Sequence, residues 1–342
     1  MNAFLRWSFV IALAAASSIS KADDTSALLT RLNAAAAQSS LDEQDLKPWH
    51  LKVDFQMFDK KGKPGEQGTM EEWWSEPKLY KLVFTSPSYS ATEIHNQDGI
   101  FRSPEATPLP YALQTLERAV LHPMPTEDEL ANSHPILRRE TIAKIKMDCI
   151  MLGQPIKDNP SIPLGLFPTY CMEKDQNLLR ISYDAGMLEI VRARIGTFQQ
   201  RTVAVDFFVA DGEGKLLNGH VAALTTDMTG ATFAPAQTMK KVVADGVVRA
   251  ASGVVAGLKL SGPPPVYPPE ARQNHITGSV VMVAIIGVDG HISQLKVIST
   301  PSGELAISAL VAVHQWVYRP YLLNGVPTNV MTTITVNYQI SP

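Results

Sequence analysis

The residues able to do chemistry are few in this chain and are scattered along it. Its eight histidines include no His-x-x-x-His or His-Glu-x-x-His pair, the spacings that place two metal ligands on one helical face. The sequence also lacks the Gly-x-Ser-x-Gly turn that exposes a nucleophilic serine. We therefore predict no catalytic residue, no metal site and no cofactor, and we expect that the protein is not an enzyme.

Adjacent carboxylates and adjacent tryptophans occur in one predicted strand, residues 69–75. Successive side chains of a strand point to opposite faces of the sheet, so Glu71 and Glu72 cannot act as a catalytic pair from that strand. For the same reason, one ring of Trp73-Trp74 is expected in the core and the other outside. The outer ring is a candidate binding platform, but a covered hydrophobic contact is favoured because large rings are usually buried.

The N-terminus has the three parts of a secretory signal. Arg6 precedes an apolar stretch, residues 7–16, and Ser20 and Ala22 occupy the small-residue positions of a cleavage site before Asp23. We predict a signal peptide at residues 1–22 and an exported mature protein. The alternative is an uncleaved membrane anchor, but an anchor needs ~20 apolar residues and this stretch is shorter.

The chain has two cysteines, Cys149 and Cys171. In an exported protein an even pair predicts a disulfide, and the loop between them is rich in proline. Cross-linking the ends of this loop would remove unfolded-state entropy worth about 3 kcal/mol. The alternatives are two buried free thiols or a reactive pair, and the absence of a Cys-x-x-Cys spacing disfavours a redox role.

Length and composition limit the architecture. The 342 residues suffice for two domains, and 45% hydrophobic with 18% charged residues is typical of a globular protein. The net charge of -3 gives no electrostatic basis for binding nucleic acid. After the signal peptide we expect an antiparallel β-rich domain at residues 23–240, a connection at 241–262 with one strand possible at 242–250, and a small domain at 263–342.

The first domain is predicted to be an antiparallel half-barrel with helices. Helices are expected at residues 24–39 and 110–121, where apolar side chains share one face. Strands are expected where β-branched or alternating segments are separated by turn signals, namely 49–58, 69–75, 79–85, 89–95, 178–184, 189–197, 202–209 and 219–225, with a hairpin loop at 59–68 and a further strand between 136 and 151. Strand series of this kind curve into a barrel or half-barrel.

The C-terminal domain is predicted to have the order β-β-α-β, which makes the whole chain α+β. Two strands, residues 280–286 and 292–298, flank an Asp-Gly hairpin signal. Ser302 is the expected N-cap of a helix whose apolar face includes Trp316, and this ring is expected to anchor the helix to the sheet. A final strand at residues 330–338 alternates.

These C-terminal residues resemble the C-terminal domain of TonB-type energy transducers. The resemblance covers less than a quarter of the chain, and its strength lies in the order and spacing of common residues. The marks are Tyr267-Pro268, Ala271-Arg272, Gly278-Ser279-Val280, Asp289-Gly290, Ser302-Gly303, Ala309, Trp316-Val317-Tyr318, Pro320, Gly325 and Pro327.

The resemblance implies a partner-binding edge on the last strand. The family takes an extended segment of an outer-membrane protein on this strand by β-augmentation. The strand corresponds here to Met331, Thr332, Thr333, Ile334, Thr335, Val336 and Asn337. The alternatives are that this edge pairs with a second copy in a homodimer or is capped, because exposed edges promote aggregation.

The same resemblance implies a location in the Gram-negative periplasm and a part in TonB-dependent transport. The alternative location is the inner membrane, with an anchor and a chain that faces the periplasm. The classical transducers keep their anchor and follow it with a long Pro/Lys-rich spacer. This chain has no such spacer, so it departs from the family in the features that energy transduction uses.

The first domain faintly resembles the periplasmic lipoprotein carriers of the LolA/LolB type, whose curved sheet holds an acyl chain. This resemblance implies a second hypothesis, a carrier of lipid or another hydrophobic ligand. A third is an envelope hydrolase whose site assembles from scattered residues. An apolar hollow between sheet and helices would favour the carrier, and a cleft with converging polar groups would favour the enzyme. The absence of both would favour the interaction module.

Overall fold

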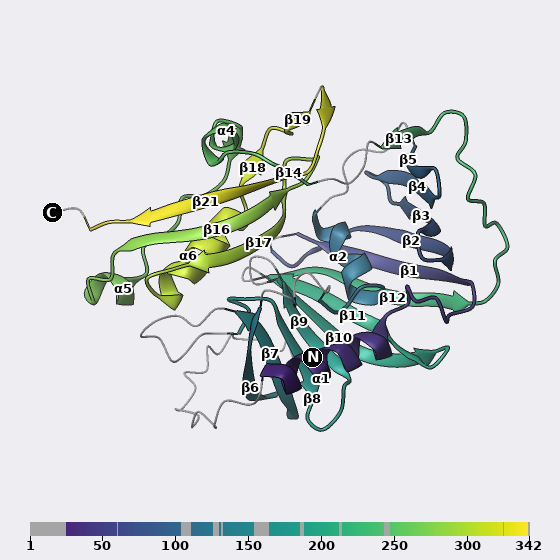
Figure 1. Ribbon diagram of the computed structural model, residues 1–342, viewed down its shortest axis with the longest axis horizontal. Helices are drawn as coiled ribbons and strands as arrows, with labels where there is room; N and C mark the ends of the chain where they lie inside the picture. Colours follow the sequence, from purple (N-terminus) through teal and green to yellow (C-terminus); the bar gives the residue numbers. More distant parts are fainter. Residues whose placement is uncertain are drawn as a thin grey trace, which may run out of the picture.

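Two β-sheets of unequal size organise the molecule (Figure 1), and the α+β class predicted from the sequence is confirmed. The computed structural model describes residues 25–59, 61–103, 111–125, 130, 133–153, 164–184, 188–211, 214–242, 247–323 and 325–340. The predicted signal peptide at residues 1–22 therefore lies outside the described residues.

The first part of the chain forms a 13-stranded sheet in which every neighbouring pair is antiparallel, in the order β13-β5-β4-β3-β2-β1-β12-β11-β10-β9-β8-β7-β6. Its elements are α1 (Thr25–Ser39), β1 (Trp49–Phe58), β2 (Pro64–Glu76), β3 (Leu79–Thr85), β4 (Ser90–Asn96), β5 (Gly99–Arg102), α2 (Tyr111–Val120), β6 (His134–Ile142), β7 (Ile145–Gly153), β8 (Thr169–Glu173), β9 (Leu179–Asp184), β10 (Leu188–Phe198), β11 (Arg201–Asp211), β12 (Gly214–Thr225) and β13 (Lys240–Val242).

The sequence predicts most of these elements and misses those with weak alternation. Both helices and the strands from β1 to β4 and from β9 to β12 lie where they are expected. Where one strand is predicted between residues 136 and 151, the chain forms the hairpin β6–β7, and β2 begins inside the predicted loop at 59–68. β5 and β8 are four and five residues long, too short for periodicity to reveal them.

Helices α1 and α2 cover one face of the large sheet, which we call the helix-covered face. The strand registers place alternate residues of β1 on this face, and Trp49, Leu51 and Val53 are nearly or completely buried there. Apolar residues of both helices complete its core, with Leu113 and Leu116 from α2 and Leu32 from α1. The sheet thus buries its apolar side beneath its own helices.

Close approach between neighbouring strands on this face requires a glycine. Phe207 of β11 lies over Gly219 of β12, its register partner, and a Cβ atom on Gly219 would come within 2.1 Å of the Phe207 ring. The ring fills the space that a side chain would occupy.

Trp73 and Trp74 lie on opposite faces, as predicted. Trp74 is 1% exposed and stacks on Trp49, with ring centroids 5.6 Å apart. Trp73 lies on the opposite face, where its indole Nε1 donates to the carbonyl oxygen of Thr229 and its ring stacks on His50. The chain after β12 therefore partly covers the outer ring, which agrees with the covered hydrophobic contact favoured from the sequence.

The last part of the chain forms a mixed four-stranded sheet, ordered β14-β21-β16-β17. Its elements are β14 (Val248–Arg249), α4 (Ser252–Ala256), β15 (Lys259–Ser261), α5 (Pro269–Gln273), β16 (Gly278–Ile286), β17 (Ile292–Ser299), α6 (Gly303–His314), β18 (Val317–Tyr318), β19 (Leu322–Leu323), β20 (Val326–Pro327) and β21 (Val330–Tyr338). The predicted β-β-α-β order of β16, β17, α6 and β21 is present, and Ser302 caps α6 by accepting a hydrogen bond from the Leu305 amide at 3.2 Å.

An apolar contact joins the two parts. Met151 at the end of β7, together with Leu166 and Phe167, is buried in the same cluster as the core of the C-terminal domain. Strand β17 also lies close to α2. The C-terminal sheet therefore faces the large sheet along its β17 side and directs its β21 side away from it (Figure 1).

Candidate functional site

The last strand, β21, separates its residues into two sets. Its even-numbered side chains point into the core, where Ile334 is 7% and Tyr338 3% exposed. Thr333, Thr335 and Asn337 are exposed to solvent. This is the alternation predicted for residues 330–338, and it fixes the direction of the backbone groups as well.

The hydrogen bonds of β14 show which backbone groups of β21 point away from β16. The amide of Val248 donates to the carbonyl oxygen of Asn329, and the amide of Ala250 donates to that of Met331, both at 3.0 Å. Peptide groups of a strand alternate between its two edges with a period of two. Residues 333, 335 and 337 therefore direct their N–H and C=O groups toward the same outer edge as Asn329 and Met331.

This outer edge, which we call the β21 edge, is occupied only at its start. β14 pairs with Val330 and Met331, and the Thr332 hydroxyl donates to the Ala250 carbonyl oxygen at 3.2 Å. Helix α4 follows directly and lies against β21. Within the described residues, the part of β21 beyond Met331 is paired with β16 alone. The structure thus leaves three outward peptide groups without a strand partner.

Tyr267, Pro268 and Ala271 fix the chain segment that leads into the C-terminal domain. The Tyr267 hydroxyl donates to the carbonyl oxygen of Ile276 at 2.6 Å, and its ring packs edge-on against Tyr338 at 5.4 Å. Pro268 is the N-cap of α5, and Ala271 in that helix is completely buried. These residues hold the end of β21 in place.

The family-motif residues around the first hairpin of the domain form or stabilise its turns. Gly290 has φ +82°, and a Cβ atom there would lie 1.9 Å from the Tyr318 carbonyl oxygen, so only glycine fits. Gly278, with φ +136°, packs against Pro301. Asp289 accepts from the His291 amide at 3.0 Å, and its hydrogen bond to the imidazole raises the pKa of His291.

Trp316 packs against the core of the C-terminal domain, but it lies beyond the helix whose apolar face was expected to include it. Helix α6 ends at His314, and the half-buried Trp316 ring lies beyond it, against the connection that precedes the domain. The indole Nε1 donates to the Pro263 carbonyl oxygen at 2.8 Å, and the Lys259 ammonium lies 3.2 Å from the ring centroid. Trp316 therefore fastens the connection, and Pro320 lies half-buried between β18 and β19.

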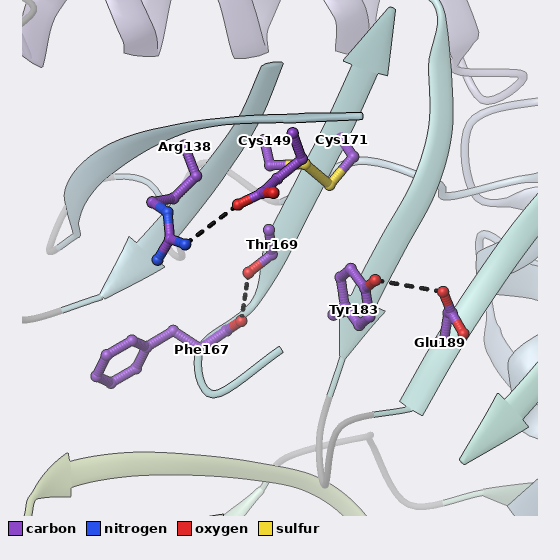
Figure 2. Close-up of a disulfide and its surroundings, with 8 residues drawn as sticks. Arg138, Cys149, Phe167, Thr169, Cys171, Tyr183 and Glu189 are labelled. Atoms are coloured by element: carbon purple, nitrogen blue, oxygen red, sulfur yellow. Dashed lines mark hydrogen bonds and ion pairs between the residues drawn. A yellow bond between two sulfur atoms is a disulfide. The ribbon is translucent and has the colours of Figure 1, made fainter. Parts of the chain in front are cut away.

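Cys149 and Cys171 form the predicted disulfide, and they face each other across β7 and β8. Figure 2 shows the bond on the sheet beside Arg138, which pairs with Glu140 at 3.1 Å. Both cysteines are completely buried with Met147 and Ile181 on the face opposite the helices. Because neither cysteine is exposed to solvent, the disulfide has the burial of a structural bond and not of a reactive one.

Acidic side chains gather beneath α2 on the helix-covered face. Burial is the main cause that raises the pKa of Glu72, well above its usual value, and that of Glu117, to about 7. Burial also opposes ionisation of Glu93, but hydrogen bonds from His95 and Arg102 outweigh it and lower the pKa of Glu93. Among the described residues no three metal-ligating side chains are grouped to hold an ion.

Among the described residues, a small depression lies where a carrier would need a hollow. It lies between the ends of the helices and β9–β11 and has a volume of about 10 Å³, far smaller than the ~300–1,000 Å³ of typical ligand pockets. Arg192 lines it and is 4% exposed, but its guanidinium donates to the Ala119 carbonyl oxygen and the Ser182 hydroxyl. This side chain caps the end of α2, where a cation is stabilised by the helix dipole.

Comparison with known proteins identifies the C-terminal domain. Residues 263–340 match the family described as Gram-negative bacterial TonB protein C-terminal, which confirms the resemblance predicted from the sequence. No curated protein matches the chain.

Three solved structures are similar to larger parts of the chain. A DUF1329 family protein from Desulfovibrio piger is 11% identical, with 61% of this chain and 95% of that chain covered and a TM-score of 0.36. A LolA superfamily protein from Nitrosomonas europaea is 7% identical, with 57% and 92% covered and a TM-score of 0.38. A putative outer membrane lipoprotein-sorting protein domain from Vibrio parahaemolyticus is 10% identical, with 57% and 90% covered and a TM-score of 0.36.

The structure adds one functional feature that sequence reasoning does not find. The possible strand at residues 242–250 divides into β13, which pairs with β5, and β14, which pairs with β21. The signal in the sequence is a pair of valine doublets, Val242-Val243 and Val247-Val248. Periodicity marks them as strand formers, but it does not say which sheet each one joins.

Proposed function

We propose that this is an exported binding protein of the Gram-negative cell envelope, located in the periplasm. Its TonB-like domain captures an extended segment of an outer-membrane or other envelope protein by β-augmentation, in TonB-dependent transport. The observation that carries the proposal is the row of outward peptide groups at residues 333, 335 and 337 of the β21 edge. An extended segment gains backbone hydrogen bonds when it adds to such an edge.

The placement of the domain favours β21 over β17 as the binding strand. The two are the outer long strands of the small sheet, but β17 lies close to α2 of the large sheet. The β21 edge is directed away from the large sheet, where a partner can approach it (Figure 1).

A positive charge beside the β21 edge favours an acidic partner segment. Arg249 is the register partner of Met331 at the start of this edge, and it is exposed. A surface cation attracts segments of the opposite sign and disfavours basic ones.

The carrier and hydrolase alternatives have less support. Trp49, Trp74 and the helices α1 and α2 occupy the helix-covered face, so an acyl chain could enter only if a helix moved away. The acidic group of Glu72, Glu93 and Glu117 lies between α2 and the large sheet, with Glu72 buried and the other two half-buried, and not in an open cleft. Binding through the β21 edge therefore remains the better supported proposal.

The decisive experiment separates backbone from side-chain recognition at one position. Full-length parent, Thr335→Pro and Thr335→Ala proteins are immobilised and exposed to solubilised outer-membrane proteins, and the captured proteins are identified by mass spectrometry. Thr335→Pro deletes an outward N–H and should abolish capture, whereas Thr335→Ala keeps it and should capture as the parent does. Circular dichroism checks that both variants fold.

Capture by a folded Thr335→Pro variant equal to that of the parent would overturn the proposal. If the only protein captured is a second copy of this chain, the edge serves homodimer pairing.

Export is tested separately. The predicted cleavage before Asp23 gives a mature protein in the soluble periplasmic fraction, and N-terminal sequencing of that fraction checks it. A retained Met1 in the inner-membrane fraction would support the anchored alternative. Within the part of the chain that the structure describes, no helix is long and apolar enough to cross a membrane.

A further inference from the structure

The segment just before the C-terminal domain already makes the kind of contact that the proposed partner would make. Residues 247–251, which we call the strap, run parallel to the start of β21. The strap is fixed to the β21 edge by the two backbone hydrogen bonds from Val248 and Ala250 and by the hydroxyl of Thr332. It is therefore a short strand added to the same edge on which the proposed function depends.

The strap buries none of its side chains completely, but the chain is tethered on both sides of it. Val247 is 37% exposed and Arg249 is exposed, while Ala250 is half-buried against the core of the small domain. On its far side, Val255 of α4 is 2% exposed within the core of the small domain. On its near side the chain leads back to β13, which pairs with β5 at the rim of the large sheet. These tethers keep the strap close to the edge when its own contacts break.

The occupied groups are the continuation of the open ones. Asn329 and Met331 accept from the strap, and residues 333, 335 and 337 continue the same outward series. If the strap leaves, the row of outward peptide groups extends from three residues to five. A partner strand that uses the whole row must take the place of the strap.

We propose that the strap is an internal competitor for the β21 edge, which is displaced when a partner strand is captured. This inference rests on the proposed function and adds its regulation. Because the strap is part of the same chain, it rebinds as an intramolecular ligand at high effective concentration. Only molecules whose strap is released can bind a partner along the whole edge. The apparent affinity for the partner is therefore the intrinsic affinity multiplied by the fraction of released molecules.

The test uses a defined probe in place of the unidentified partner. An acetylated, amidated synthetic peptide with the sequence of residues 246–252, GVVRAAS, is titrated into isotope-labelled full-length protein, and the amide signals of Asn329, Met331 and Thr333 are followed by NMR. The peptide should bind to protein whose strap is released from the β21 edge. It should not bind to protein whose strap is cross-linked to that edge.

Two variants release the strap. Ala250→Pro removes the amide that donates to Met331, and Thr332→Val removes the hydroxyl that donates to Ala250. Each lost hydrogen bond should raise the apparent affinity for the peptide by roughly 2- to 10-fold. Ala251→Pro is the matched control, because Ala251 has φ -62°, which suits proline, and the amide of Ala250 is kept.

A third variant locks the strap. Arg249 and Met331 are register partners across the parallel pair, so Arg249→Cys with Met331→Cys can be oxidised to a cross-link. The oxidised double variant should not bind the peptide, and reduction should restore binding to the level of the parent. Parent protein treated with the same reductant controls for the native disulfide.

Equal peptide affinity in the parent, the released variants and the oxidised double variant would overturn the inference, as would the absence of binding to any of them. The outcome is separable from that of the proposed function. If the peptide binds the released edge while no envelope protein is captured, the strap is a competitor on an edge with another role. If envelope proteins are captured equally by locked and released forms, the proposed function stands and the strap is a permanent part of the sheet.

Discussion

The two sheets of this molecule bury their apolar faces in a similar way but treat their edges differently. The large sheet ends in β13, only three residues long, on one side and in the charged strand β6 on the other. The small sheet ends in β14, which is two residues long and pairs with only the first two residues of the nine-residue strand β21. Short and charged edge strands are ways in which proteins prevent unwanted pairing.

This difference separates a scaffold from a binding surface. Thr333, Thr335 and Asn337 carry no charge that would repel an incoming strand, and none of them is proline. The large sheet has its helices over its apolar face, and the depression described beside them is small. The difference supports the proposal that the small sheet binds a partner at its edge while the core of the large sheet supplies stability, and the following predictions test each side of it.

The largest effect is expected in the core of the half-barrel. Trp74→Ala removes a ring that is 1% exposed and stacks on Trp49, and it should lower the free energy of unfolding by about 3–5 kcal/mol. Trp73→Ala, on the other face of the same strand, is the control and should cost less. Urea unfolding followed by circular dichroism compares the two, and equal losses would show that the faces are not distinct.

The disulfide should contribute somewhat less. Replacing Cys149 and Cys171 together by alanine opens a loop of 22 residues, and the chain-entropy argument gives a loss of about 3 kcal/mol. The urea midpoint of the double variant should fall to that of the reduced parent. A double variant as stable as the oxidised parent would show that the β7–β8 pairing holds the loop without the bond.

Trp316 should matter less than its place in the sequence motif indicates. Trp316→Ala loses the hydrogen bond to Pro263 and the contact with the Lys259 ammonium, which together contribute about 1–2 kcal/mol. It also loses the packing of a half-buried ring against the domain core. The C-terminal domain should remain folded with its thermal midpoint lowered slightly. Local unfolding of that domain, seen as loss of protection in hydrogen exchange, would restore the interpretation that the ring seals helix to sheet.

The last prediction concerns pH, because two carboxyl groups beside α2 change stability in separate pH ranges. Burial and the nearby Glu93 raise the pKa of Glu117 to about 7, so the folded state binds the proton more tightly and loses stability as pH rises from about 4.5 to 7. Glu93 has a lowered pKa, so its contribution is lost as pH falls below the unfolded value. Glu117→Gln should flatten the decline above pH 5 in urea unfolding, and an unchanged slope would contradict this assignment.

The sequence alone predicts the parts whose cause is local. Alternation in residues 330–338, the N-cap at Ser302 and the Asp289-Gly290 turn give the β-β-α-β order, because backbone period, capping and turn geometry depend on nearby residues. An even pair of cysteines in an exported chain gives the disulfide. The family resemblance adds which strand to examine, since its marks lie in a fixed order.

Tertiary structure decides the features that depend on distant neighbours. Trp74 is buried and Trp73 is not because α2 covers the face on which Trp74 lies. Alternation places the two rings on opposite faces but does not indicate which face will be covered. That Trp316 fastens the connection follows from where α6 ends and where Pro263 passes. Among the described residues, the β21 edge has no strand partner beyond Met331 because the strap ends at α4. The residues of a strand do not themselves indicate which edge its neighbours leave free.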